Sequence, residues 1–126
     1  MAALKEKGIA LLGSFTGSIA TAANPTLFTT PAGKIARITH VVFRDPSGSA
    51  AAATSLTLTG FPGTISLANL ITANTGYVVA QAGPAAATPQ TPVQGTEIAA
   101  STAVVLTTTT GAAVTVTVDV FGYLTN

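Results

Sequence analysis

Cysteine and tryptophan are absent from this 126-residue chain, which has one histidine and one methionine. Without cysteine, neither a disulfide framework nor a thiolate metal site can form. The fold must therefore rest on hydrophobic packing and hydrogen bonding, which a single domain of this length can supply.

Charged residues are scarce: they make up 7% of the chain, against about a quarter in an ordinary globular domain. The formal net charge is +1, and the five bases are scattered, so we expect no nucleic-acid partner. A chain that is 48% hydrophobic does not have the composition of a disordered one. Because so few charges oppose association, this surface is typical of a subunit attached to neighbours. The five bases are Lys5, Lys7, Lys34, Arg37 and Arg44.

A short apolar run at residues 9–12 follows Lys5 and Lys7, as in a signal peptide. Gly8 and Gly13 bound the run, which is shorter than the apolar core of about 7–15 residues that signal peptides have. We therefore expect no signal peptide. No stretch approaches the roughly 20 apolar residues of a membrane span, so we also expect no membrane partner.

The single histidine, His40, cannot supply a two-histidine metal site or support the several histidines of a cupin-like site. The sequence contains no glycine-rich phosphate loop followed by a lysine. We therefore expect no catalytic residues, no cofactor and no metal. His40 is expected to pack or hydrogen-bond within a strand.

The four acidic residues are Glu6, Asp45, Glu97 and Asp119. Asp45 lies in a turn sequence, where an aspartate ordinarily caps its own backbone. Asp119 lies in a strand and is expected to pair with Lys34, Arg37 or Arg44. The competing hypothesis is a hydrolase of viral envelopes or glycans, which needs two of Asp45, Glu97 and Asp119 about 5–10 Å apart in one cleft.

Strict alternation marks residues 113–124 as a strand, with valines on one face and Thr115, Thr117, Asp119 and Phe121 on the other. A second β-branched run covers residues 103–110, and the two predict a hairpin that turns near Thr110–Gly111. Residues 34–44 predict another long strand. Shorter strands are expected at residues 26–29, 54–61, 77–81 and 96–100.

These short strands, bounded by glycine and proline, predict an all-β, single-domain antiparallel β-sandwich of jelly-roll type. Residues 1–20 are expected to form an N-terminal arm or an edge strand, and residues 21–126 the β-sandwich domain. Residues 83–95, which contain three prolines, are expected to form a long loop. The predicted core contains Ile38, Val42, Leu56, Leu58, Val114, Val116, Val118 and Val120.

Two stretches carry a family resemblance: residues 31–47, PAGKIARITHVVFRDPS, and residues 118–124, VDVFGYL. They resemble small virion proteins of tailed bacteriophages, which are similar in kind to head decoration (cement) proteins and to small fibre or spike domains. The resemblance implies a single jelly-roll domain and no active-site residues.

On this basis we expect a non-enzymatic protein that binds the outside of a phage head and stabilises it. Its partners would be the major capsid protein and further copies of itself, with a trimer favoured. It would be found on the virion head surface, and in the host cytoplasm during assembly. The alternative is a tail or head fibre or spike domain that binds a host receptor or glycan. The candidate contact residues are Leu4, Lys5, Lys7, Ile9, Leu11, Leu12, Pro84, Pro89 and Pro92.

Overall fold

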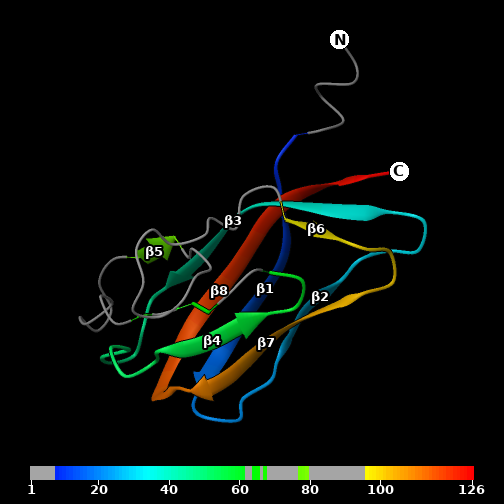
Figure 1. Ribbon diagram of the computed structural model, residues 1–126. Coiled ribbons are helices and arrows are strands. Elements are labelled where there is room, and N and C mark those ends of the chain that lie inside the picture. The colour runs from blue at the N-terminus through cyan, green and yellow to red at the C-terminus, as the bar shows by residue number, and fades with distance from the viewer. Residues whose placement is uncertain (1–7, 62–63, 66, 68–76, 80–95) are drawn as a thin grey trace.

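The structure is a computed structural model that describes residues 8–61, 64–65, 67, 77–79 and 96–126. These residues contain strands and no helix, and the strands form two antiparallel sheets that pack around one core (Figure 1). The predicted all-β sandwich is confirmed. Its jelly-roll type stays a prediction.

The larger sheet has five strands and contains both long strands of the prediction. In order across the sheet, β1 (Ala10–Ile19) pairs with β8 (Ala112–Thr125), β8 with β3 (Ile35–Arg44), and β3 with β5 (Tyr77–Val79). The short strand β6 (Glu97–Ile98) also pairs with β3. β8 therefore has a neighbour on each side over its middle part, residues 117–122.

The smaller sheet has three strands in the order β2 (Thr26–Thr29), β7 (Ala103–Thr110) and β4 (Ser55–Leu58). β2 and β7 have the bounds that their β-branched runs predict. β4 is shorter than the predicted strand over residues 54–61, because the chain turns at Thr59–Gly60, where Gly60 has a positive φ of 76°.

The predicted hairpin between residues 103–110 and 113–124 is wrong. β7 belongs to the smaller sheet and β8 to the larger one, so the connection at Gly111 carries the chain from one sheet to the other. A Cβ atom at Gly111 would overlap the carbonyl oxygen of Ile19, so only glycine fits this close passage. A β-branched run shows that a segment is extended, and it does not show which strand is its neighbour.

A bulge in β3 corrects the face assigned to Val42. Ile38 lies opposite Gly122 and His40 lies opposite Phe121, so Thr39 is an extra residue that reverses the alternation after it. Beyond the bulge, Val41 is fully buried and Val42 is half-buried on the outer face. The predicted core position at Val42 is therefore wrong by one residue.

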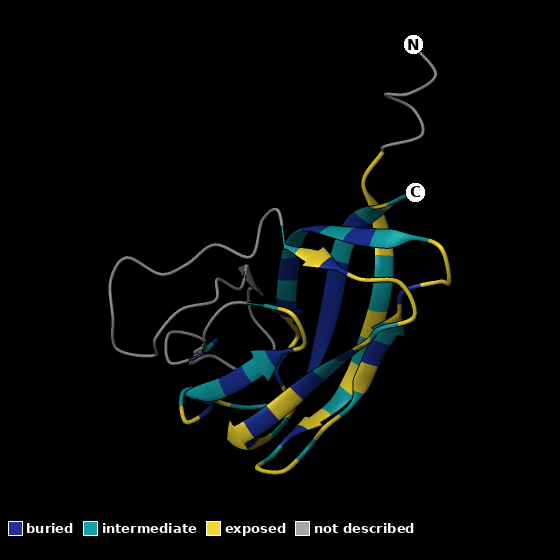
Figure 2. Cartoon of the chain, turned by 45° about the vertical axis from the view of Figure 1, so that its right-hand side comes forward, coloured by how far each residue is buried: buried dark blue, intermediate teal, exposed yellow. Residues whose placement is uncertain are grey.

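The core lies between the inner faces of the two sheets, as the buried stripes of Figure 2 show. Six of the eight predicted core residues are buried there, and Val114 is partly buried against them. The buried residues from that prediction are Ile38, Leu56, Leu58, Val116, Val118 and Val120.

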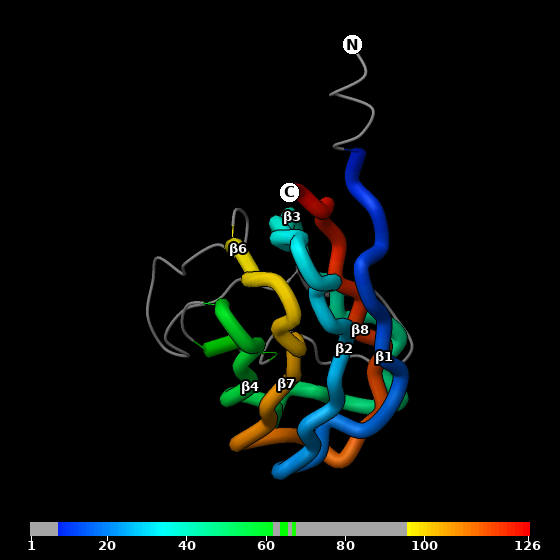
Figure 3. The backbone as a smooth tube through the Cα atoms, turned by 90° about the vertical axis from the view of Figure 1, so that its right-hand side faces the viewer, coloured from blue at the N-terminus to red at the C-terminus, as the bar shows by residue number. Residues whose placement is uncertain are grey.

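The segment that was expected to be an arm or an edge strand forms β1 over residues 10–19, at one edge of the larger sheet. β1 and β2 run close together along one side of the sandwich (Figure 3). A Cβ atom at Gly13 would overlap the backbone of Leu27, so the glycine permits this approach of the two sheets. Residues 1–7 lie outside the described residues.

The bulge in β3 can be tested with a matched pair of isosteric substitutions. Val41→Thr places a hydroxyl in the core and is expected to lower the free energy of unfolding by about 1–3 kcal/mol. Val42→Thr places the same hydroxyl on the outer face and is expected to change it by less than about 0.5 kcal/mol. Urea unfolding of both variants measures the difference. A larger loss of unfolding free energy for Val42→Thr than for Val41→Thr would contradict the bulge. It would support the uninterrupted alternation that places Val42 in the core.

Candidate functional site

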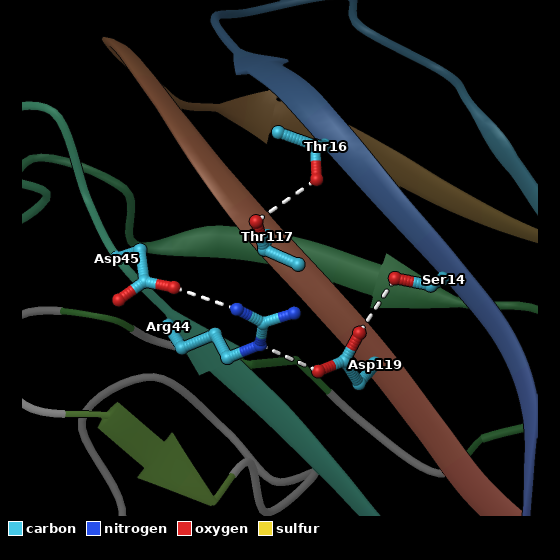
Figure 4. Close-up of polar contacts among 6 residues, drawn as sticks. All are labelled: Ser14, Thr16, Arg44, Asp45, Thr117 and Asp119. Carbon is cyan, nitrogen blue, oxygen red and sulfur yellow. Dashed lines mark hydrogen bonds and ion pairs between the residues drawn. The ribbon is translucent and has the colours of Figure 1, made fainter.

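The outer face of the larger sheet carries a polar cluster at its centre, made of Ser14, Arg44, Asp45 and Asp119. The residues come from β1, from the end of β3 and from β8, and Figure 4 shows their side chains pointing toward one another. Asp119 lies on this face because it alternates with the core valines Val118 and Val120.

Both carboxylate oxygens of Asp119 are occupied. The Ser14 hydroxyl donates to Oδ1 at 2.6 Å, and Nε of Arg44 donates to Oδ2 at 2.7 Å. The side chain of Asp119 is 9% exposed, whereas that of Arg44 is 45% exposed. Next to them, the hydroxyls of Thr16 and Thr117 hydrogen-bond to each other at 2.9 Å.

Arg44 also binds a second carboxylate, because its Nη1 donates to Asp45 Oδ2 at 2.6 Å. Neighbouring residues of a strand point to opposite faces, so a regular continuation would carry Asp45 away from Arg44. Asp45 instead has a left-handed backbone, with φ at 51°, and this conformation ends β3. The described contact of its side chain is thus the ion pair with Arg44, where the sequence suggested a backbone cap.

The cluster holds Asp119 in its ionised form. Burial alone raises the pKa of its carboxyl group, but hydrogen bonds from Arg44 and Ser14 and the charge of Arg44 outweigh burial. The pKa of Asp119 therefore lies below its usual value. Hydrogen bonds to Asp119 and Asp45 raise the pKa of Arg44, so the pair stays charged.

The sequence left three bases as possible partners of Asp119, and the structure selects Arg44. Arg37 pairs with Glu97 at 2.5 Å, with both side chains well exposed. Lys34 donates a hydrogen bond to the side chain of Asn126. These two bases therefore have other partners.

Asp45 and Asp119 share one guanidinium, so two of the three acids named for the hydrolase hypothesis are brought together. A glycosidase needs one carboxyl group that stays protonated, with a raised pKa. The pKa of Asp119 is lowered, and its two oxygens accept hydrogen bonds from Arg44 and Ser14. The chemistry of this cluster is that of an internal ionic crosslink between strands.

An apolar strip lies on the same sheet, where β1 begins, and consists of Ile9, Leu11 and Phe121. Ile9, just before β1, is 61% exposed, and Leu11, near its start, is 53% exposed; residues 8–11 form an exposed stretch (Figure 2). Leu11 is the register partner of Phe121. On its other side, Phe121 stacks on His40, with ring centroids 4.5 Å apart and planes 9° from parallel.

The predicted contact residues fall into three groups. Ile9 and Leu11 are exposed in the apolar strip, whereas Leu12 is partly buried against the core of its own chain. The others lie outside the described residues: Leu4, Lys5, Lys7, Pro84, Pro89 and Pro92.

Sequence reasoning missed Ser14 and Thr16 as partners of β8. Their signal in the sequence was the alternation of Ser14, Thr16 and Ser18 with Phe15, Gly17 and Ile19, which is a strand pattern in a segment also considered as an arm. His40 was expected to pack or hydrogen-bond in a strand, and it stacks on Phe121 and contacts the Thr39 hydroxyl through Nδ1 at 3.0 Å.

Within the described residues, no group of three His, Asp or Glu side chains is placed to hold a metal ion. Nor does this part of the chain include a helix with the length and apolar character of a membrane span. Comparison of the sequence with protein-family models and with curated proteins, and of the structure with solved structures, finds no match.

The polar cluster predicts an acid-dependent stability. Because the folded pKa of Asp119 is below its unfolded value of about 3.9, its contribution is present at neutral pH and is lost as the pH falls through the folded pKa. Asp119→Asn is expected to lower the free energy of unfolding at pH 7 by about 1–2 kcal/mol and to flatten its decline in acid. Denaturant unfolding at several pH values measures both effects.

The matched control is Asp45→Asn, which removes the exposed carboxylate from the same guanidinium. Its side chain is 63% exposed, so its removal is expected to change stability little. Equal losses for the two variants would contradict the assignment of Asp119 as the central partner.

Proposed function

We propose that the protein is a non-enzymatic decoration (cement) protein of a phage head, and that it binds the outside of the assembled shell and stabilises it. The proposal includes a domain of the jelly-roll type and a partner surface formed by the major capsid protein. It also includes a homo-oligomeric state on the shell.

The observation that carries the proposal is the exposure of Ile9 and Leu11 at 61% and 53%. Both are large aliphatic side chains, and Leu11 is held by a strand that pairs with β8. A contact surface on a sheet loses little conformational freedom when it binds. Complete burial of one such side chain contributes about 1.5–3 kcal/mol, and this gain recurs at every occupied position of a shell.

The distribution of charge supports a structural role. Three of the four acids lie in the described residues, and each pairs with an arginine of its own chain. The apolar strip has no charged member. A contact of this kind depends on shape and on apolar area, which a regular shell presents identically at each position.

The alternative function is a fibre or spike domain that binds a receptor or glycan. A sugar platform ordinarily uses aromatic rings that are exposed together, often on loops. Among the aromatic residues whose side chains the structure describes, Phe43 is buried and the rest are half-buried. This arrangement favours decoration over glycan binding.

A density map of the intact virion tests the location. We expect density for this chain at regular positions on the outer head surface. Density confined to the tail or the portal would contradict decoration and would support the fibre or spike alternative.

The contact is tested by titrating purified protein onto heads that lack it. Leu11→Asp is expected to weaken binding at least about tenfold, because it places a charge in an apolar contact. Thr109→Asp is the control, since Thr109 is exposed on β7 of the other sheet. If Leu11→Asp and Thr109→Asp bind heads equally well, the apolar strip is not the contact surface.

The role of the first residues needs a deletion that leaves β1 intact. Removal of residues 1–15 would take away more than half of β1 together with that part of its pairing with β8, so loss of binding would report on folding. Removal of residues 1–7 leaves the paired segment in place. Head binding that is unchanged by this shorter deletion would exclude Leu4, Lys5 and Lys7 as contacts.

A further inference from the structure

The outer edge of β1 is the longest strand edge in the described part of the chain. β1 has ten residues and pairs with β8 on one side, and among the described residues no strand pairs with its other side. Edge strands present a row of backbone donors and acceptors to which another strand can add. The strand edges elsewhere are shorter or partly covered.

The outer edges of β2 and β4 are shorter than that of β1 and less available for pairing. β2 has four residues and lies between Pro25 and Pro31, which limit pairing. β4 also has four residues, and its second edge forms a bridge between Leu56 and Ile65. β1 has neither a proline nor a bridge of this kind.

The sequence around β1 lacks the features that usually block a strand edge. Residues 8–24 contain no charged residue, no histidine and no proline. Natural edge strands are commonly protected by lysine, by proline or by bulges. β1 has two register irregularities, near Leu11–Gly13 and near Ser18–Ile19, and the stretch between them is regular.

We infer that the outer edge of β1, over residues 13–18, pairs antiparallel with the same edge of a second copy of this chain. In an antiparallel pair, directly opposite residues lie on the same face of the sheet. A pairing that keeps the two outer faces together and is centred on Thr16 therefore sets Ser14 of one copy opposite Ser18 of the other, and Thr16 opposite Thr16.

Hydroxyl groups suit this self-pairing because each can both donate and accept a hydrogen bond. β1 already forms such a pair on its other side, between Thr16 and Thr117 at 2.9 Å. All three hydroxyl residues are exposed at the edge. A twofold contact sets this edge against an identical edge, with Thr16 beside its own copy. A charged edge would therefore repel itself, and this edge has no charge.

The core-facing side of β1 also favours a contact made by backbone hydrogen bonds rather than by apolar side chains. The ring of Phe15 lies over Gly17, where a Cβ atom would overlap it. The chain thus closes its own core at this edge. The second copy supplies a strand and its hydroxyl groups, and the two larger sheets join into one.

The pairing uses the outer β1 edge of each copy, and no further β1 edge remains available, so the twofold contact produces a dimer. This inference specifies the homo-oligomer within the proposed function, and it does not depend on shell binding. A trimer is the competing expectation from the sequence. Measurement of the mass of the free protein separates the two, and it is independent of the outcome of the head-binding experiment.

The experiment is native mass spectrometry and analytical ultracentrifugation of the full chain over a range of concentrations. We expect a reversible dimer. Thr16→Lys puts two lysines side by side at the pairing and is expected to raise the dimer dissociation constant at least about tenfold. Thr107→Lys, at an exposed position in the middle strand of the other sheet, is expected to leave it unchanged.

A cysteine variant keeps the test decisive if Thr16→Lys does not fold. The chain has no cysteine, so Thr16→Cys and Thr107→Cys each carry one defined thiol. A short bismaleimide is expected to link Thr16→Cys into dimers and to link Thr107→Cys much less. A monomer at all concentrations, a mass of three chains, a dimer that Thr16→Lys does not weaken, or equal crosslinking of the two cysteine variants would overturn the inference.

Discussion

Burial of both faces of β8 is the constraint on which the rest of the structure depends. Its inner valines, Val116, Val118 and Val120, lie in the core, and on its outer face the whole residues Thr117 and Asp119, backbone included, are only 7% and 6% exposed. A buried carboxylate is costly unless it is paired and hydrogen-bonded. Ser14 on β1 and Arg44 on β3 supply those bonds, so the polar cluster joins three adjacent strands.

The same cluster specifies the strand register. A shift of β8 by one residue would turn Asp119 into the core and would move the valines to the outer face. It would also break the bonds of Asp119 to both neighbours at once. The central charge therefore contributes to the choice of one arrangement as well as to stability.

The division of the outer face has consequences for function. At its centre, charges and hydroxyls satisfy one another within the chain. At the start of β1, aliphatic side chains remain exposed, and along its edge the backbone remains available. The two surfaces can act together, because the apolar strip lies at one end of β1 and the proposed self-pairing uses residues 13–18. In the proposed function, the two surfaces would let one subunit contact the shell and a second copy at the same time.

The sequence by itself determined where the chain is extended. The β-branched runs predicted the bounds of β2 and β7 and nearly those of β3 and β8, because alternation is a local property of a strand. It also determined most of the core, since valines that alternate with polar residues must share one face. The exposed pair Ile9 and Leu11 was among the predicted contacts, because a short apolar run was visible without its surroundings.

Only the tertiary structure decided how those strands are arranged. The chain passes between sheets at Gly111, and no local signal separates this passage from a hairpin turn. The extra residue at Thr39 exchanges Val42 for Val41 in the core, because a bulge is defined against the neighbouring strand. The choice of Arg44 for Asp119, and the role of Ser14, likewise depend on which strands flank β8. Strand pairing joins residues far apart in the sequence, and periodicity carries no information on which of them meet.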